Sequence, residues 1–330
     1  MDIEKWSLRI GTAALVLSVV VRLGSAGVLG SALELLQTPE AVSAILFLET
    51  GRLVYAAAPQ TDSPEPETPQ PTVPEEPEPA LPVFAPEDAS LVKIKNVCGL
   101  ETDVSAMLTT PLSWQLQAAE PTVLIVHSHG SESYENKENF QESGYYRTLD
   151  TRYNMVSVGE RVAQILESGG VSVIHDTTLH DYPSYNDSYN QSRSSVKEYL
   201  DKYPSIRLVL DLHRDAARDK EGNQAPLTAT VQGRKVAKLM LVVGTNVRLK
   251  HPNWPENMSL AVKLHALLEK NYPGICRPIS FRNQRFNQDL SPGALLIEVG
   301  AAGNDRQEAL ASAELLAQTI LELANGTEGA

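Results

Sequence analysis

The sequence contains little cysteine and few basic residues, and each shortage narrows what the protein can be. Only two cysteines, Cys98 and Cys276, occur among 330 residues, and no C-x-x-C pair is present. A zinc–thiolate site and a disulfide framework are therefore excluded. Lys and Arg number 28 against 41 Asp and Glu, which gives a net charge of −13. The phosphate backbone would repel so acidic a chain, so we expect no nucleic-acid partner.

Basic residues are missing altogether between Leu53 and Val92, where the chain carries eight acidic residues. Within this stretch, residues 59–88 hold ten of the 21 prolines. Such a segment lacks the apolar residues needed to fold, and proline stiffness and charge repulsion keep it extended. We therefore expect a disordered Pro/Glu-rich linker over 59–88. It would join a short apolar or helical segment at 36–58 to a globular domain at 89–330.

The chain also lacks an uninterrupted apolar run of the about 20 residues that a membrane helix needs. The run over 10–21 is bounded by Arg9 and Arg22, and the apolar character resumes beyond Arg22. A membrane anchor or signal-anchor over 1–35, with Arg22 reaching toward the interface, is the favoured interpretation. A cleaved signal peptide and a soluble amphipathic helix are the alternatives. The first two interpretations place the remaining chain outside the cytoplasm.

From about residue 100, short apolar strands alternate with helical patterns. Strands are expected at VLIVH (123–127), VSVIH (171–175), LVLDLH (208–213) and ALLIEVG (294–300), and also at TATVQ and AKLMLVVG. Apolar residues recur at helical spacing over 155–166, over 260–268 and after Asn304. This alternation predicts an α/β domain with a largely parallel twisted sheet and helices on both faces.

Three of the apolar strands end in residues that can bind metal or move protons. They are His127, His129 and Glu132 at the end of VLIVH, Asp211, His213 and Asp215 at the end of LVLDLH, and Glu298 in ALLIEVG. Open α/β sheets bind ligands at the carboxyl ends of their strands. Because alternate residues of a strand face the same side, His127 and His129 could point together, as could Asp211 and His213.

Two imidazoles, a carboxylate ligand and a separate glutamate base are the parts of a zinc hydrolase site. Loop hydrogen bonds or helix caps would explain any single polar strand end, but three complementary ends together favour a site. For the other histidines, the sequence gives no comparable evidence of a metal site. Solvation or hydrogen bonding explains His175 and His180, a position on the rim explains His251, and a structural role in a helix explains His265.

Several stretches resemble the stage II sporulation protein P family of membrane-anchored cell-wall hydrolases from spore-forming Firmicutes. They include VLIVHSHGSESY, IHDTTLHDYPSYNDSY, YPSIRLVLDLHRDA and FNQDLSPGALLIEVG, and the resemblance covers about residues 90–325. This family is similar in fold to zinc-dependent N-acetylmuramoyl-L-alanine amidases. The resemblance implies a peptidoglycan substrate, cut between N-acetylmuramic acid and L-alanine and at peptide cross-links. It also implies a single-pass membrane protein that works on the mother-cell side of the engulfing septum. Stage II sporulation proteins D and M would be its partners there.

Carried over by position, the resemblance makes His129 and His213 zinc ligands and Glu298 the catalytic glutamate. Amidases of this fold take a carboxylate ligand about fifteen residues after the first histidine. The corresponding stretch here reads TRYNMV and offers no glutamate. We therefore predict Glu132 as the third ligand of Zn²⁺, with Glu142 and His127 as alternatives.

Further polar residues near the strand ends complete the predicted site. Asp211 or Asp215 is expected to orient an imidazole. Arg214, Asn287 and Gln288 are expected either to hold substrate carboxylates and amides or to make local loop and sheet bonds. The sequence thus predicts an extracytoplasmic zinc amidase and endopeptidase. A wall-binding scaffold without hydrolytic activity and a zinc carboxypeptidase are the alternatives.

Overall fold

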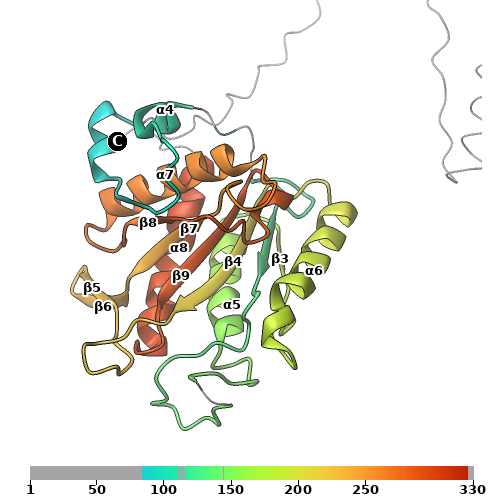
Figure 1. Ribbon diagram of the computed structural model, residues 1–330, viewed down its shortest axis with the longest axis vertical. Coiled ribbons are helices and arrows are strands. Elements are labelled where there is room, and N and C mark those ends of the chain that lie inside the picture. Colours follow the sequence, from blue (N-terminus) through green and yellow to red (C-terminus); the bar gives the residue numbers. More distant parts are fainter. Residues whose placement is uncertain (1–83, 111, 113–115, 144, 326–330) are drawn as a thin grey trace, which may run out of the picture. The chain divides into compact units, whose positions relative to one another are not determined.

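A computed structural model describes residues 84–110, 112, 116–143 and 145–325 (Figure 1). The predicted membrane anchor at 1–35, the segment at 36–58 and the linker up to residue 83 lie outside these described residues. At the end of the predicted linker, Pro86–Leu91 forms a 3-10 helix (η1) that contacts the helix Trp254–Asn271 (α7). Within the described part of the chain, no helix is both long and apolar enough to cross a bilayer.

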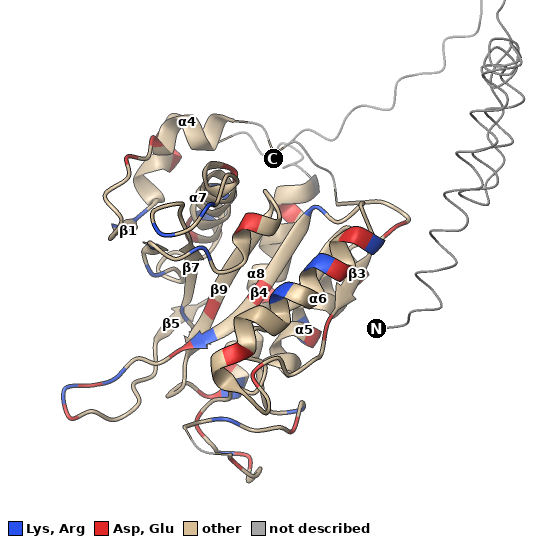
Figure 2. Ribbon diagram, turned by 45° about the vertical axis from the view of Figure 1, so that its right-hand side comes forward, with Lys and Arg blue, Asp and Glu red and all other residues tan. Residues whose placement is uncertain are grey.

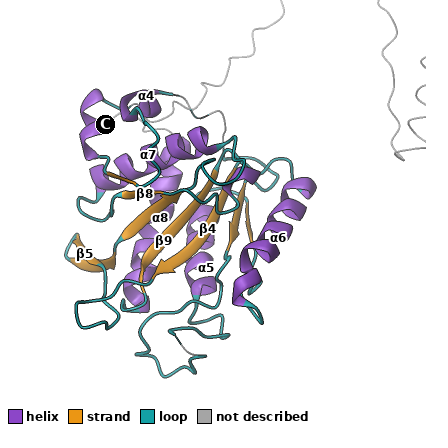
Figure 3. Cartoon of the chain, in the orientation of Figure 1, coloured by secondary structure: helices purple, strands orange, loops and turns teal. Residues whose placement is uncertain are grey.

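Seven strands form one sheet, in the order β1-β8-β7-β9-β4-β2-β3. Their bounds are Ile94–Asn96 (β1), Val123–Val126 (β2), Val173–His175 (β3), Leu208–Asp215 (β4), Leu239–Val243 (β7), Ile279–Phe281 (β8) and Ala294–Ala301 (β9). Every neighbouring pair runs parallel except β7 and β9. The prediction of an α/β domain with a largely parallel sheet is therefore confirmed (Figure 3).

One of the predicted strands lies outside this sheet. Thr228–Val231 (β5) pairs only with Arg234–Ala237 (β6), in a separate antiparallel hairpin. Gln232 and Gly233 connect the two strands, and both have positive φ (50° and 76°). Two central residues with positive φ are the mark of a type I′ turn, whose twist suits a tight hairpin. The segment AKLMLVVG, predicted as one strand, is divided between two strands. Ala237 is the last residue of β6, and β7 begins at Leu239.

Helices cover both faces of the sheet. On one face, Met155–Ser168 (α5), α7 and Arg306–Asn325 (α8) share a large core with the strands, and the short helix Val104–Thr109 (α4) contacts α7. Ser188–Lys202 (α6) packs on the other face against a smaller core. Alternate residues of β2 join the two cores, which is why this strand is an unbroken apolar run in the sequence. Charges of both signs are interspersed along α6, as expected for the solvent-facing side of a surface helix (Figure 2).

Candidate metal and catalytic site

The two central strands place an imidazole and a carboxyl group side by side. His213 of β4 is in register with Glu298 of β9, and paired residues of parallel strands point to the same face. Asp211 lies two residues before His213 and faces the same way. Its Oδ1 is 2.9 Å from His213 Nε2. The side chains of Asp211 and His213 therefore point together, as the strand alternation predicts.

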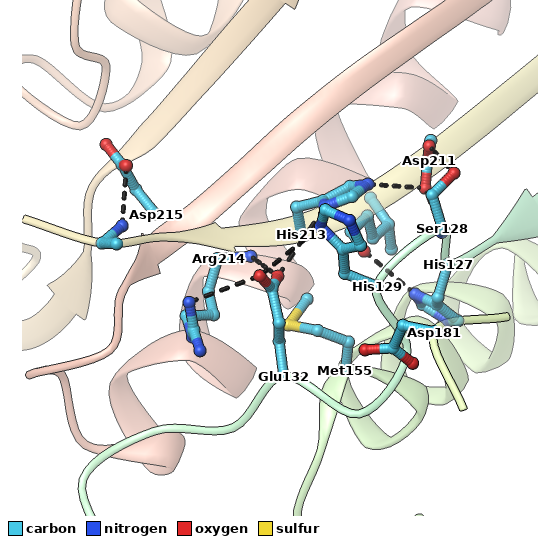
Figure 4. Close-up of polar contacts among 12 residues, drawn as sticks. His127, Ser128, His129, Glu132, Met155, Asp181, Asp211, His213, Arg214 and Asp215 are labelled. Atoms are coloured by element: carbon cyan, nitrogen blue, oxygen red, sulfur yellow. Dashed lines mark hydrogen bonds and ion pairs between the residues drawn. The ribbon is translucent and has the colours of Figure 1, made fainter. Parts of the chain in front are cut away.

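The loop after β2 brings His129 and Glu132 to His213 (Figure 4). Glu132 Oε1 lies 3.6 Å from His129 Nδ1, and Glu132 Oε2 lies 3.7 Å from His213 Nδ1. One ligand atom from each residue lies within 4.8 Å of the other two. Two imidazoles and a carboxylate that converge in this way are a donor set that fits a catalytic zinc site.

Glu132 remains ionised although it is buried. Burial raises its pKa, but Arg214 and His213 outweigh burial and bring the pKa down to about 2. The Arg214 backbone N–H donates to Glu132 Oε2 at 3.3 Å, and Arg214 Nη1 lies 3.4 Å from Oε1. Arg147 Nη2 is 3.7 Å from the same Oε1. The carboxylate is thus held in its charged form beside the two imidazoles.

The two histidines of the group differ in their protonation. Burial, together with the neighbouring His213, lowers the pKa of His129 to about 4, so His129 is neutral at physiological pH. Burial also lowers the pKa of His213, but Asp211 and Glu132 more than reverse this and raise it well above its ordinary value. A cation that binds His213 would displace its proton. A carboxylate behind an imidazole, as Asp211 is here, fixes the orientation of the ring.

Glu298 lies beside this group in a contrasting state. Burial is the main cause that raises its pKa to about 8, and the nearby Glu132 and Asp215 carboxylates add to this, whereas His213 lowers it. Its buried Oε2 has no hydrogen-bond partner among the described residues. Burying a carboxyl oxygen without a hydrogen-bond partner costs free energy. We therefore expect a bound water, ion or substrate to contact Glu298 Oε2. A carboxyl group whose pKa is near neutrality suits general acid–base chemistry.

His127, one alternative ligand, is directed away from the group. Its Nδ1 lies 3.1 Å from the Leu212 carbonyl and its Nε2 lies 2.9 Å from His175 Nε2. Gly159 of α5 makes room for this pair, since a Cβ there would lie 2.5 Å from His127 Nε2. The expectation that His127 and His129 point together is wrong. Strand alternation stops with β2 at Val126, before either histidine.

Glu142, the other alternative ligand, is exposed on the loop that follows Glu132 and does not belong to the converging group. Among the described residues, Glu132 is therefore the carboxylate that lies with the two histidines.

The remaining predicted residues contact other protein groups. Arg214 donates to three backbone carbonyls of the 133–146 loop in addition to its contact with Glu132. Asp215 forms an ion pair with Arg277 at 2.6 Å and lies apart from the group (Figure 4). Gln288 accepts from the Gly244 N–H and donates to the Val242 carbonyl. Asn287 donates to the Tyr189 carbonyl. These are the local loop and sheet bonds that the sequence left as one of two interpretations.

The other histidines lie outside the group. His180 Nε2 is 3.2 Å from Asp176 Oδ2, which agrees with the hydrogen-bonding interpretation. His251 is fully buried, so the interpretation as a rim residue is wrong. The loop that carries His251 is held inward by Asn253, whose amide donates to the Asp289 carbonyl at 3.0 Å. His265 is buried within α7, as a structural residue would be.

Sequence reasoning missed an aromatic wall beside the two histidines. The Tyr185 ring stacks on His129 with centroids 4.5 Å apart, and Arg147 lies 4.1 Å above the Tyr185 ring. Tyr189 lies edge-on to His129 at 5.4 Å and nearly parallel to His213 at 6.4 Å. Burial and the surrounding carboxylates raise the pKa of Tyr189. The signal was available in the stretch DYPSYNDSY, where Tyr185 and Tyr189 are four residues apart, a spacing that predicts one side of a helix.

Comparison with known proteins assigns the family. The family model described as Stage II sporulation protein P matches residues 57–321. Stage II sporulation protein P of Bacillus subtilis (strain 168) is 31% identical over 220 residues, which are 63% of this chain and 52% of that protein. The chain thus spans about half the length of the curated relative that it matches.

Solved structures of low sequence identity also match. The N-acetylmuramoyl-L-alanine amidase AmiC2 of Nostoc punctiforme is 17% identical, with a TM-score of 0.37 over 62% of this chain and 94% of that one. The catalytic domain of the amidase CwlV from Bacillus (Paenibacillus) polymyxa var. colistinus is 13% identical, with a TM-score of 0.36 over 61% of this chain and 97% of that one. On the match of the family model to most of its residues, this chain belongs to the stage II sporulation protein P family.

Proposed function

We propose that this chain is a zinc-dependent peptidoglycan hydrolase of sporulation, with N-acetylmuramoyl-L-alanine amidase and endopeptidase activity. The observation that carries the proposal is the convergence of His129, Glu132 and His213 beside a buried carboxyl oxygen of Glu298 that has no partner among the described residues. Membership in the stage II sporulation protein P family supports sporulation as the setting. It also supports peptidoglycan as the substrate.

The residues of the site divide the chemistry among them. His129, Glu132 and His213 would hold Zn²⁺, which when bound polarises a carbonyl group and lowers the pKa of a bound water to about 7. Glu298 takes a proton from the attacking water and returns it to the leaving nitrogen. The ionised form is needed for the first step. A nearby cation favours that form, because it lowers the pKa of a carboxyl group.

The setting in the cell belongs to the same proposal. Residues 1–35 would anchor the chain in the cell membrane by a single pass, with the catalytic domain outside the cytoplasm on the mother-cell side of the septum. Stage II sporulation proteins D and M would be its partners there. The apolar stretches around Arg22 and the Pro/Glu-rich linker of the sequence support this arrangement.

Product analysis on purified sacculi tests the function. The purified protein should bind one zinc ion per chain by elemental analysis. It should release stem peptides from the glycan and convert cross-linked peptides to monomers. Chelation should abolish both activities, and added zinc should restore them. Trimming of free peptide ends alone would instead identify a carboxypeptidase. Binding to sacculi without any released product would identify a scaffold.

Asp211→Asn should weaken zinc binding by about 10- to 100-fold, the usual cost of losing a carboxylate that orients a metal-binding imidazole. The variant keeps the shape of the side chain but removes the charge 2.9 Å from His213 Nε2. Competition with a chromogenic chelator measures the affinity. Asp201→Asn, on the exposed side of α6, is the matched control. Unchanged zinc affinity in Asp211→Asn would show that His213 needs no such support.

A further inference from the structure

Helix α6 brings a tyrosine hydroxyl group to the candidate metal site. This hydroxyl has no role in the mechanism proposed above. Tyr189 is the second residue of α6 and is half-buried. Its ring is nearly parallel to the His213 ring, with an interplanar angle of 13°. On a further side it contacts Phe286, with centroids 6.1 Å apart. The ring therefore lies against the histidine pair of the candidate metal site.

The position of Tyr189 is fixed by contacts of its backbone. The Asn287 amide donates to the Tyr189 carbonyl at 2.8 Å and to Ser192 Oγ at 3.2 Å. Asn287 has a φ of 58°, in the left-handed region that asparagine tolerates better than most residues. This loop thus ties the first turn of α6 to the 286–289 segment. A ring held by such contacts is pre-organised and need not be ordered when substrate binds.

The hydroxyl of Tyr189 has no hydrogen-bond partner within the described part of the chain, although the group interacts electrostatically with Asp211, Glu298 and Glu132. Tyr134, which is also close to the site, differs in this respect, because its hydroxyl donates to the Val299 carbonyl at 2.8 Å. Tyr189 is only half-buried, and its hydroxyl is not among the fully buried polar atoms of the described residues that lack a partner. The hydroxyl is therefore open to solvent and free to donate to a molecule bound beside the two histidines.

We propose that Tyr189 is a catalytic residue whose hydroxyl donates a hydrogen bond to the carbonyl oxygen of the scissile amide. The inference rests on the proposed hydrolytic function and adds a named residue to it. As the water oxygen bonds to the carbonyl carbon, the π electron pair moves onto the carbonyl oxygen. When the C–N bond breaks, that pair re-forms the carbonyl, and the nitrogen leaves with the proton that Glu298 returns.

Tyr189 donates a hydrogen bond in these reaction steps but transfers no proton. A phenol with an ordinary pKa of about 10 is a hydrogen-bond donor throughout the neutral range. Donors aimed at an oxygen that gains negative charge stabilise the transition state more than the ground state. The hydroxyl should therefore act on the rate of the chemical step and much less on substrate binding.

Tyr189→Phe in the full-length protein tests this role, because it keeps the ring contacts and removes only the hydroxyl. We expect kcat to fall about 100-fold, at the low end of the loss of one oxyanion donor. KM should stay within about twofold, and both the zinc affinity and Tm should be unchanged. Tyr199→Phe, on the same helix but packed in the smaller core, is the matched control and should keep the wild-type kcat. Soluble cross-linked muropeptides with attached glycan serve as the substrate.

Two results would overturn the inference alone: a Tyr189→Phe variant with wild-type kcat, or one whose activity falls only in proportion to lost zinc. The first would make the hydroxyl dispensable. The second would make it a support of the metal site. A wild-type protein that binds zinc but leaves peptidoglycan intact would overturn the proposed function, and this inference with it.

Discussion

Glu298→Gln should keep the fold and the bound zinc but lower the rate of peptidoglycan hydrolysis by about 10²- to 10⁴-fold, the usual contribution of a positioned general base. Glutamine preserves the shape of the side chain but cannot accept and return a proton. Glu298 is in register with His213, and its buried Oε2 has no partner among the described residues. Release of stem peptide measures the rate, and elemental analysis of the same sample measures the zinc content.

The pH profile distinguishes a base from a structural carboxyl group. Burial raises the pKa of Glu298 to about 8 in the metal-free protein, and the ionised form predominates only above the pKa. Wild-type kcat/KM should therefore rise with pH through the pKa of Glu298, which a bound cation would shift downward. The Gln variant should lack this rise. Glu198→Gln on the exposed side of α6 is the control. Near-normal rates in Glu298→Gln would make the residue structural, and loss of zinc would make it a ligand.

The part of the site that could be predicted is the part that regular strands determine. Asp211, His213 and Glu298 lie within β4 and β9, where alternation fixes the face of each side chain and parallel pairing places the strand ends together. His127 could not be placed by the same rule, because it lies beyond the end of β2 and its ring is held by Leu212 and His175. Which groups meet it depends on packing against α5, and no local pattern encodes that packing.

The fold was predictable to a similar extent. Alternating apolar strands and helices indicate a parallel sheet, and most of the strand pairs are indeed parallel. The antiparallel pairing of β7 with β9 could not be inferred, since both are short apolar runs with the same appearance. The place of Tyr189 in the site could not be predicted for another reason. Its spacing from Tyr185 marks one side of a helix, but only the tertiary structure shows that this side covers His129.

The position of Glu132 supports the proposal that it takes the place of the carboxylate ligand that the family resemblance implies. The resemblance implies a carboxylate ligand at the start of the helix after the first histidine, where TRYNMV offers none. In the structure, the Met155 N–H at the start of α5 donates to the Glu132 carbonyl at 2.9 Å, and Ser133 is bridged to Asn154. Glu132 therefore lies beside the beginning of that helix although it is only three residues from His129. The proposed ligand thus comes from a residue that lies beside the start of α5 and not from α5 itself.

Glu132→Ala should accordingly lose zinc about as severely as His129→Ala, and both should lose more than the about 10- to 100-fold expected for an outer partner such as Asp211. Each variant removes one of three ligands. Glu132→Ala also removes the buried carboxylate that balances the Arg214 charge, so the stability of this variant should fall as well. Glu132→Gln, which retains the packing around Arg214, separates the loss of the ligand charge from the loss of structure. Chelator competition on the folded variants gives the zinc affinities, and thermal unfolding gives Tm.

His127→Ala is the contrasting variant. It leaves a cavity against α5 and removes the partner of His175, so the free energy of unfolding should fall by about 1–3 kcal/mol. Its zinc affinity should stay near that of the wild type, because the His127 ring faces Leu212 and His175 rather than Glu132. If instead His127→Ala loses zinc while Glu132→Ala keeps it, the third ligand is His127. The ion pairs of Glu132 with Arg214 and Arg147 would then be purely structural.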